Sequence, residues 1–141
     1  MAILNYTTTV PVDKTIGEIQ KLLIKNGASK IVFDYADGLP VSLTFVAVFK
    51  GETAFYSLPS RFEGIYKLLK NQSRVPKTME QAHKIGWRIL KDWIESQLAL
   101  IEAEIAELPE IFLPYGVTRN GERLYDYIKS LDSNNSPLLL S

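Results

Sequence analysis

The longest helical pattern in the chain runs from Thr78 to Leu108 and contains no proline. Its first half carries apolar side chains on two sides, which predicts a helix clamped between two layers. Its second half alternates apolar spacings of four and three, the a/d pattern of a helix that packs along another helix. This seam could meet another helix of the same chain or a second copy of it. Its residues are Ile94, Leu98, Ile101, Ile105 and Leu108.

Three S/T-x-x-E/Q patterns predict where helices begin. Thr78 with Gln81 marks the start of the long helix, and Pro109 is expected to end it. Thr15 with Glu18 marks a helix over residues 13–25, and Ser60 with Glu63 marks one over 60–70.

Alternating apolar and polar residues predict strands elsewhere. Residues 3–12 read as a first edge strand, and 31–35, 41–49 and 53–58 read as three further strands. Asp37-Gly38 is a pair typical of tight turns and lies between the strands predicted over 31–35 and 41–49. Leu39-Pro40, however, suggests a loop longer than two residues.

The segment after Pro109 predicts two smaller elements. Residues 110–117 are apolar and interrupted by proline, so we expect an extended strap that packs back on the core. A turn at 118–121 leads into a short helix over 122–129, with Leu124, Tyr127 and Ile128 facing inward.

The order β-α-β-β-β-α, followed by a long helix, predicts an α+β fold. We expect a small antiparallel sheet with helices packed on one face and one long helix in the C-terminal half. Residues 1–129 should form a single domain and 130–141 a flexible tail, because SLDSNNSPLLLS has linker composition.

Composition excludes several classes of function. The 141 residues contain no cysteine and one histidine. This composition excludes a cysteine nucleophile, a disulfide and a zinc site built from cysteine and histidine. His83 is the only histidine, and the sequence has no G-x-S-x-G motif that would mark a nucleophilic serine to act with it. We therefore predict no catalytic residue, no metal and no cofactor, and a binding protein rather than an enzyme. No apolar run is long enough to span a membrane and no signal peptide is recognisable, so we expect a cytoplasmic protein with no membrane partner.

The net charge is zero, but its distribution is uneven. Residues 61–91 hold eight bases and two acids, whereas residues 92–110 hold six acids and no base. Such an asymmetry indicates an anion-binding surface followed by an acidic arm. The alternative is that the two segments lie against each other, within a chain or between subunits.

The basic segment contains the candidate ligand-binding residues. Arg61 begins a predicted helix, where the exposed amides favour a phosphate. Arg74 and Lys77 precede the long helix, on which Arg88 and Lys91 accompany Trp87. Cations combined with an aromatic ring can hold nucleic acid or a nucleotide by charge and stacking. The alternative is that Trp87 packs in the core and the bases are solvated.

Three acidic residues offer a weaker alternative, a metal-dependent nuclease. Asp34, Asp37 and Glu52 lie at or near the predicted turns and could bind a divalent cation. Asp37 and Glu52 are, however, explained as turn residues, and the two turns should lie at opposite ends of the central strand.

Three stretches resemble a group of small bacteriophage and prophage proteins with no settled activity: NYTTTVPVDKTIGEIQKLLIKNGA, FYSLPSRFEGIYKLLK and GWRILKDWIESQLALIEAEIAELPEIFLPY. The most specific part is Trp87-Arg88 through Asp92-Trp93, continuing to Phe112-Leu113-Pro114-Tyr115. The resemblance implies a phage protein in a bacterial cytoplasm and supplies no site residues.

The leading hypothesis is a non-enzymatic phage accessory protein that binds nucleic acid or a phosphate-bearing ligand such as a nucleotide. It would self-associate, as a dimer, through the seam of the long helix. The alternative is an inhibitor that binds a host defence protein through its acidic arm.

Overall fold

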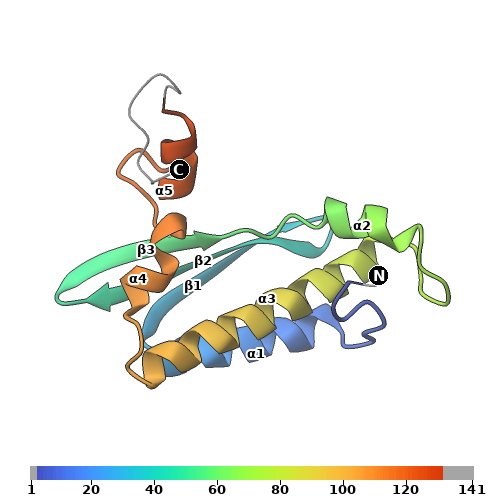
Figure 1. Cartoon of the computed structure of the whole chain (residues 1–141), viewed down its shortest axis with the longest axis horizontal. Coiled ribbons are helices and arrows are strands. Elements are labelled where there is room, and N and C mark those ends of the chain that lie inside the picture. Colours follow the sequence, from blue (N-terminus) through green and yellow to red (C-terminus); the bar gives the residue numbers. More distant parts are fainter. Residues whose placement is uncertain (1–2, 132–141) are drawn as a thin grey trace.

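The computed structural model describes residues 3–131 of the protein (Figure 1). Three strands form the sheet: β1 (Ala28–Ala36), β2 (Leu39–Phe49) and β3 (Glu52–Leu58). The helices are α1 (Val12–Lys25), α2 (Glu63–Leu69), α3 (Met79–Glu102), α4 (Leu108–Phe112), the 3₁₀ turn η1 (Leu113–Tyr115) and α5 (Leu124–Lys129). The predicted α+β class and the long helix are confirmed. No helix in this part of the chain combines the length and hydropathy needed to cross a bilayer.

The sheet is an antiparallel meander in the order β1-β2-β3. Two residues connect each pair of strands, and all four have positive φ: Asp37 at 51°, Gly38 at 79°, Lys50 at 51° and Gly51 at 82°. This is the conformation of tight hairpin turns whose twist matches that of the strands. The longer first loop predicted from Leu39-Pro40 is therefore wrong. A register shift at Asp34/Tyr35 accommodates Pro40 inside the ladder.

Helices α1 and α3 lie side by side against one face of the sheet (Figure 1). Their buried residues include Ile19 and Leu23 from α1 and Ile85 from α3, which join Leu43 and Phe45 of β2 in a single core. The two helices run in the same direction, because Glu18 pairs with Arg88 and, further along both helices, Lys25 pairs with Glu102.

The predicted first strand over residues 3–12 is wrong. Residues 4–7 form a turn, with Asn5 at φ 63°, and the chain enters α1 after Pro11. The side-chain amide nitrogen of Gln81 donates to the carbonyl oxygens of Tyr6 at 3.3 Å and Thr8 at 3.0 Å. A side chain of α3 thus satisfies backbone groups that a neighbouring strand would otherwise have to bind.

Of the three predicted helix caps, the one at Thr78 is confirmed. Its hydroxyl oxygen accepts a hydrogen bond from the backbone amide of Gln81 at 3.1 Å. The other two are wrong: Thr15 is buried inside α1, which begins three residues earlier, and the hydroxyl of Ser60 donates to the Val41 carbonyl at 2.6 Å.

The long helix ends at Glu102, earlier than the predicted Leu108. Glu104 adopts a left-handed conformation with φ 59°, and the amide of Ile105 donates back to the Leu100 carbonyl at 2.9 Å. This geometry closes a helix C-terminus. Pro109 lies instead in the first turn of α4, a position that tolerates its missing amide hydrogen.

The predicted strap over residues 110–117 does pack back on the core, but it is helical rather than extended. Phe112 of α4 is fully buried, and the Val117 amide donates to the Phe55 carbonyl at the edge of β3, at 2.8 Å. Helix α5 projects from the body of the molecule (Figure 1), and its Tyr127 and Ile128 are exposed, contrary to prediction. Most of the predicted flexible tail, residues 132–141, lies outside the described residues.

Candidate anion-binding cleft

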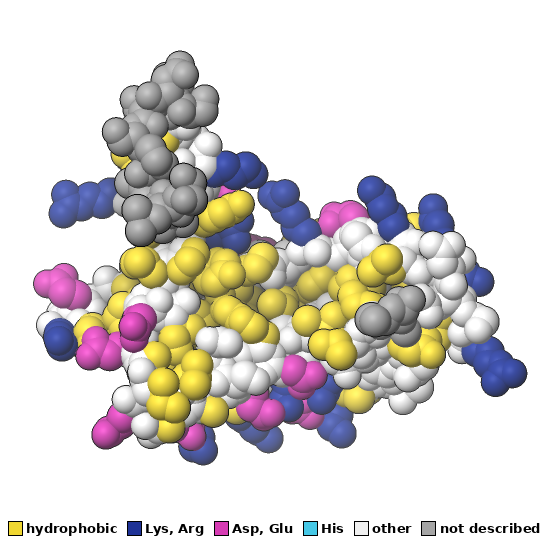
Figure 2. All heavy atoms as spheres, in the orientation of Figure 1, with side chains coloured by type: hydrophobic (Ala, Val, Ile, Leu, Met, Phe, Trp, Pro, Cys, Tyr) yellow, Lys and Arg dark blue, Asp and Glu magenta, His cyan; other side chains and the backbone are white. Residues whose placement is uncertain are grey.

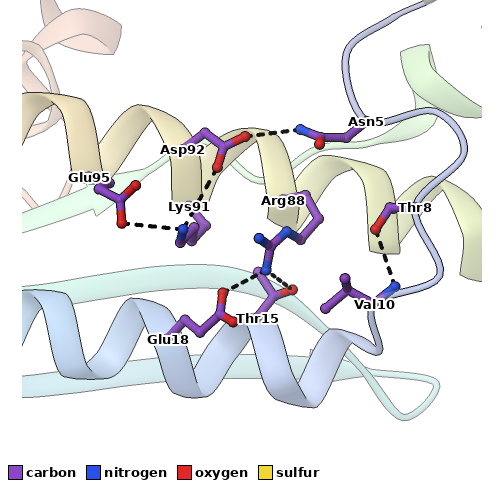
Figure 3. Close-up of polar contacts among 9 residues, drawn as sticks. All are labelled: Asn5, Thr8, Val10, Thr15, Glu18, Arg88, Lys91, Asp92 and Glu95. Carbon is purple, nitrogen blue, oxygen red and sulfur yellow. Dashed lines mark hydrogen bonds and ion pairs between the residues drawn. The ribbon is translucent and has the colours of Figure 1, made fainter.

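The structure divides the five predicted cations into paired and exposed groups. A guanidinium nitrogen of Arg88 lies 2.6 Å from a Glu18 carboxylate oxygen and 3.4 Å from the Thr15 hydroxyl oxygen (Figure 3). Lys91 lies 3.3 Å from Glu95 and 3.9 Å from Asp92. The side chains of Arg88 and Lys91 are 17% and 16% exposed. Both charges are therefore largely compensated within the molecule.

Trp87 is fully buried and cannot stack on a nucleic-acid base. Its indole N–H donates to the Pro40 carbonyl at 3.2 Å, and its ring packs edge-on against Phe33 and Phe62. A buried indole with its polar hydrogen satisfied is a core residue. Burial of the first half of the helix was indicated by its two-sided apolar pattern, and Trp87 follows that pattern rather than the charge pattern.

The exposed cations occupy two separate places. Arg74 and Lys77 lie in the loop between α2 and α3, and both are exposed. Arg61 lines a cleft bounded by the ends of β2 and β3, by α2, by α3 and by the segment around α5. The structure thus keeps Arg61 apart from the residues predicted to act with it and places it with Arg123 and Asp126.

The cleft has a volume of about 590 Å³. The charged residues that line it are Arg61, Arg123 and Asp126, and its polar lining includes Ser57. Its apolar lining is supplied by Val41, Leu58, Pro59, Phe62, Ile65, Ile89 and Leu90. In the same orientation as Figure 1, Figure 2 shows hydrophobic side chains gathered between α4 and α2, with Lys and Arg side chains projecting above them.

Arg123 forms a two-pronged ion pair with Asp126, at 2.9 Å and 3.4 Å. The hydrogen bond from Arg123 lowers the pKa of the Asp126 carboxyl group, and the nearby charges of Arg123, Lys129 and Arg61 lower it further. Three cations thus act on one carboxylate, and the pair leaves positive charge in excess at the cleft. Such a site favours an anionic ligand. Sequence reasoning missed Arg123 and Asp126, whose i,i+3 spacing at the start of the last helix was the available signal.

The predicted self-association seam is split by the structure. Ile94 and Leu98 are buried in the core of the same chain, Ile101 and Leu108 are partly buried, and Ile105 is 70% exposed beyond the end of α3. The seam therefore begins as an intramolecular contact. Its last three residues line a separate groove together with Glu104, Glu107 and Glu110.

The acids of the nuclease alternative do not converge. Asp34 accepts a hydrogen bond from the Ser42 hydroxyl at 2.6 Å, Asp37 lies in the first hairpin turn, and Glu52 begins β3 next to the second turn. Residues 3–131 contain no group of three or more histidine and acidic side chains that could hold a metal ion. His83 is buried, with its Nδ1 3.0 Å from the Met79 carbonyl oxygen and its ring edge-on to Phe62.

Comparison of the chain with models of protein families, with curated proteins and with solved structures gives no match. The phage resemblance therefore rests only on the stretches quoted above and stays a prediction.

Proposed function

We propose that the protein is a binding protein without catalytic activity, and that its cleft takes a small phosphate-bearing ligand such as a nucleotide. The observation that carries the proposal is the meeting of Arg61 and Arg123 in one cleft with an apolar lining. These residues come from distant parts of the chain, the β3–α2 connection and the residue before α5. A phage origin, a bacterial cytoplasm and a dimer remain predictions.

The chemistry of the lining suits such a ligand. A guanidinium group binds phosphate through two parallel hydrogen bonds, and Arg61 is exposed and free to turn toward one. Asp126 orients the guanidinium group of Arg123 through two hydrogen bonds before a ligand arrives. The side chains of Ile65, Ile89 and Leu90 offer an apolar wall for a ring. The volume of the cleft lies in the range of small-molecule sites, roughly 300–1,000 Å³.

The same observations favour a small ligand over extended nucleic acid, which is the second candidate. A single strand would need stacking rings and a continuous track of cations. Trp87 is buried, and Arg88 and Lys91 are paired with acids. Of the six predicted residues, Arg74 and Lys77 alone remain exposed outside the cleft.

Isothermal titration with pyrophosphate, ATP and a single-stranded oligonucleotide tests the proposal. We expect ATP to bind. Arg61→Ala should weaken the affinity for ATP by about tenfold to a hundredfold, because it removes one pair of charge-assisted hydrogen bonds. Arg123→Ala should weaken binding as well, because it also leaves Asp126 facing the ligand without a partner.

Lys77→Ala is the matched control, since it removes an exposed cation outside the cleft. It should leave the affinity for ATP unchanged. Equal losses in Lys77→Ala and Arg61→Ala, or binding of the oligonucleotide without binding of ATP or pyrophosphate, would contradict the cleft as the site.

A further inference from the structure

The end of the molecule beyond the C-terminus of α3 carries an acid-rimmed apolar groove. It lies where the α1–β1 turn, the β2–β3 end of the sheet and the link between α3 and α4 meet, and it has a volume of about 840 Å³. We call it the acidic groove. Within residues 3–131, Glu104, Glu107 and Glu110 line it, and no lysine or arginine does. Its apolar lining includes Ala47, Phe49, Ile101, Leu108 and the 70% exposed Ile105.

Two of the groove's acids are held in place. The backbone amide of Glu107 donates to a Glu110 carboxylate oxygen at 3.1 Å, and the Glu107 side chain in turn caps the first turn of α4. The exposed Ile105 stands beside this fixed charge. A chain segment that fits here must therefore bring both positive charge and an apolar side chain.

The opposite end of the molecule has that composition. The loop over residues 70–78, which we call the basic loop, projects beyond the start of α3 (Figure 1). It contains Lys70, Arg74 and Lys77, all exposed, and no acid. The exposed apolar side chains that flank it are Leu68 in α2, at 45%, and Met79 at the start of α3, at 38%.

The two surfaces cannot meet within one chain. They lie at opposite ends of α3, whose 24 residues span about 36 Å. The interpretation that the basic and acidic segments pair inside a chain thus applies to Lys91, whose partners Asp92 and Glu95 belong to the acidic segment, but not to the basic loop. Arg88 pairs instead with Glu18 of α1.

We propose that the basic loop of one copy of the protein docks in the acidic groove of the next. Both surfaces belong to the same chain and match in charge and in apolar character. The contact joins two different surfaces, so it continues into a ring or an open filament, and the smallest ring is a pair in which each copy docks its loop in the groove of the other. It does not involve the cleft that holds Arg61 and Arg123, so it is independent of the proposed ligand.

Sedimentation velocity over a protein-concentration series tests this assembly. The wild-type chain should associate at low salt, and the association should weaken several-fold between about 50 and 500 mM salt, as screened charges predict. A loop variant, Arg74→Glu with Lys77→Glu, should be monomeric. A groove variant, Glu104→Gln with Ile105→Ser, should also be monomeric; it adds no positive charge for the acidic loop variant to bind, and it leaves the α4 cap intact.

Mixing the two variants gives the sharpest result. The groove variant retains a native basic loop, and the loop variant retains a native acidic groove. One native interface per pair remains, so the mixture should form a 1:1 complex and stop there. Two copies docked reciprocally would give the same 1:1 complex, and the size of the wild-type assembly distinguishes that two-copy ring from a longer ring or a filament.

Lys14→Glu with Lys30→Glu is the matched control for the loop variant, because it makes the same change in net charge at exposed sites outside both surfaces. It should associate like the wild type, and circular dichroism should show all variants folded. A wild-type chain that stays monomeric at low salt, or two variants that remain monomeric when mixed, would overturn the proposal and leave the groove to a basic segment of another protein.

Discussion

Gly86 shows how a missing side chain makes room for an aromatic ring in the core. It lies in α3 under the ring of Phe62, and a Cβ atom built on it would lie 2.2 Å from Cδ1 of that ring. The same ring packs edge-on against His83 and Trp87. The absence of a side chain at Gly86 therefore allows Phe62 to enter the core beside the wall of the anion-binding cleft.

Gly86→Ala should destabilise the protein by about 1–3 kcal/mol, the usual cost of overpacking a core, although alanine is the better helix former. The matched control is Gly17→Ala in α1, where a Cβ would meet nothing within 4 Å. That change should stabilise by about 0.5–1 kcal/mol. Denaturant unfolding monitored by circular dichroism compares the two. A neutral Gly86→Ala would show that Phe62 moves aside at little cost.

Residue-level predictions succeeded where the determinant was local. Thr78 caps α3 because its own backbone is extended, which lets its hydroxyl oxygen accept from the backbone amide of Gln81. Thr15 carries the same local pattern, but it is buried under Arg88, a contact between residues 73 positions apart. A pattern of four residues contains no information about such a partner, and the misreading of Trp87 as a ligand residue has the same origin.

At the scale of elements, α1 and α3 are joined by one half-buried ion pair. Glu18 and Arg88 are 32% and 17% exposed and lie 2.6 Å apart. An ion pair with little solvent around it is screened less than one on the surface. This pair links the two helices next to Ile89 and Leu90 of α3, which line the cleft.

A double-mutant cycle of Glu18→Gln and Arg88→Met should give a coupling energy of about 1–3 kcal/mol. The control cycle is Glu95→Gln with Lys91→Met, a pair within α3 whose acid is 56% exposed. Its coupling should be about 0.3–0.5 kcal/mol, as for other i,i+4 pairs. Equal couplings in the two cycles would mean that burial adds nothing to the link between α1 and α3.

The start of α3 was predictable from its sequence and its end was not. Helix propensity continues past Glu102, and the seam pattern continues to Leu108. The helix is closed by a left-handed glutamate, Glu104, rather than by a glycine or by Pro109. The reason lies in tertiary structure, because Phe112 must turn back to pack against Phe45, Tyr56 and Trp93.

At the scale of the whole molecule, stability should be graded between the core and α5. The sheet, α1 and α3 share the buried residues, whereas no residue of α5 is buried. Segments with little buried surface open locally at a low free-energy cost.

Hydrogen exchange measured by NMR should show low protection in residues 124–129 and the highest protection in β2 and α3. Arg123 lowers the pKa of the Asp126 carboxyl group from its usual value of 3.8. The pair therefore stabilises α5 fully at pH values above 3.8. That contribution is lost as the pH falls through the lower, folded-state pKa. Protection factors in α5 should therefore be constant from pH 7 to 5 and decrease as the pH falls below 3.8, whereas those in Arg123→Ala should already be lower than the wild-type values at pH 7.

The fold class followed from sequence because alternation and turn residues are local signals. The cleft did not, because it depends on which distant loops become neighbours. Arg61 was recognised by its charge, but Arg123 and Asp126 are brought beside it only by the return of the chain from α4 to the edge of β3.

The two tight hairpin turns also bear on how fast the molecule folds. All three strands lie within residues 28–58, and hairpins of this kind close in about 1–10 μs. Glu18 and Arg88, by contrast, are 70 positions apart, so docking of α3 on α1 must close a long loop. We expect the sheet to form first and the docking of α3 to limit the rate. Mutations in the hairpin turns would then slow folding, and breaking the Glu18–Arg88 pair would mainly speed unfolding.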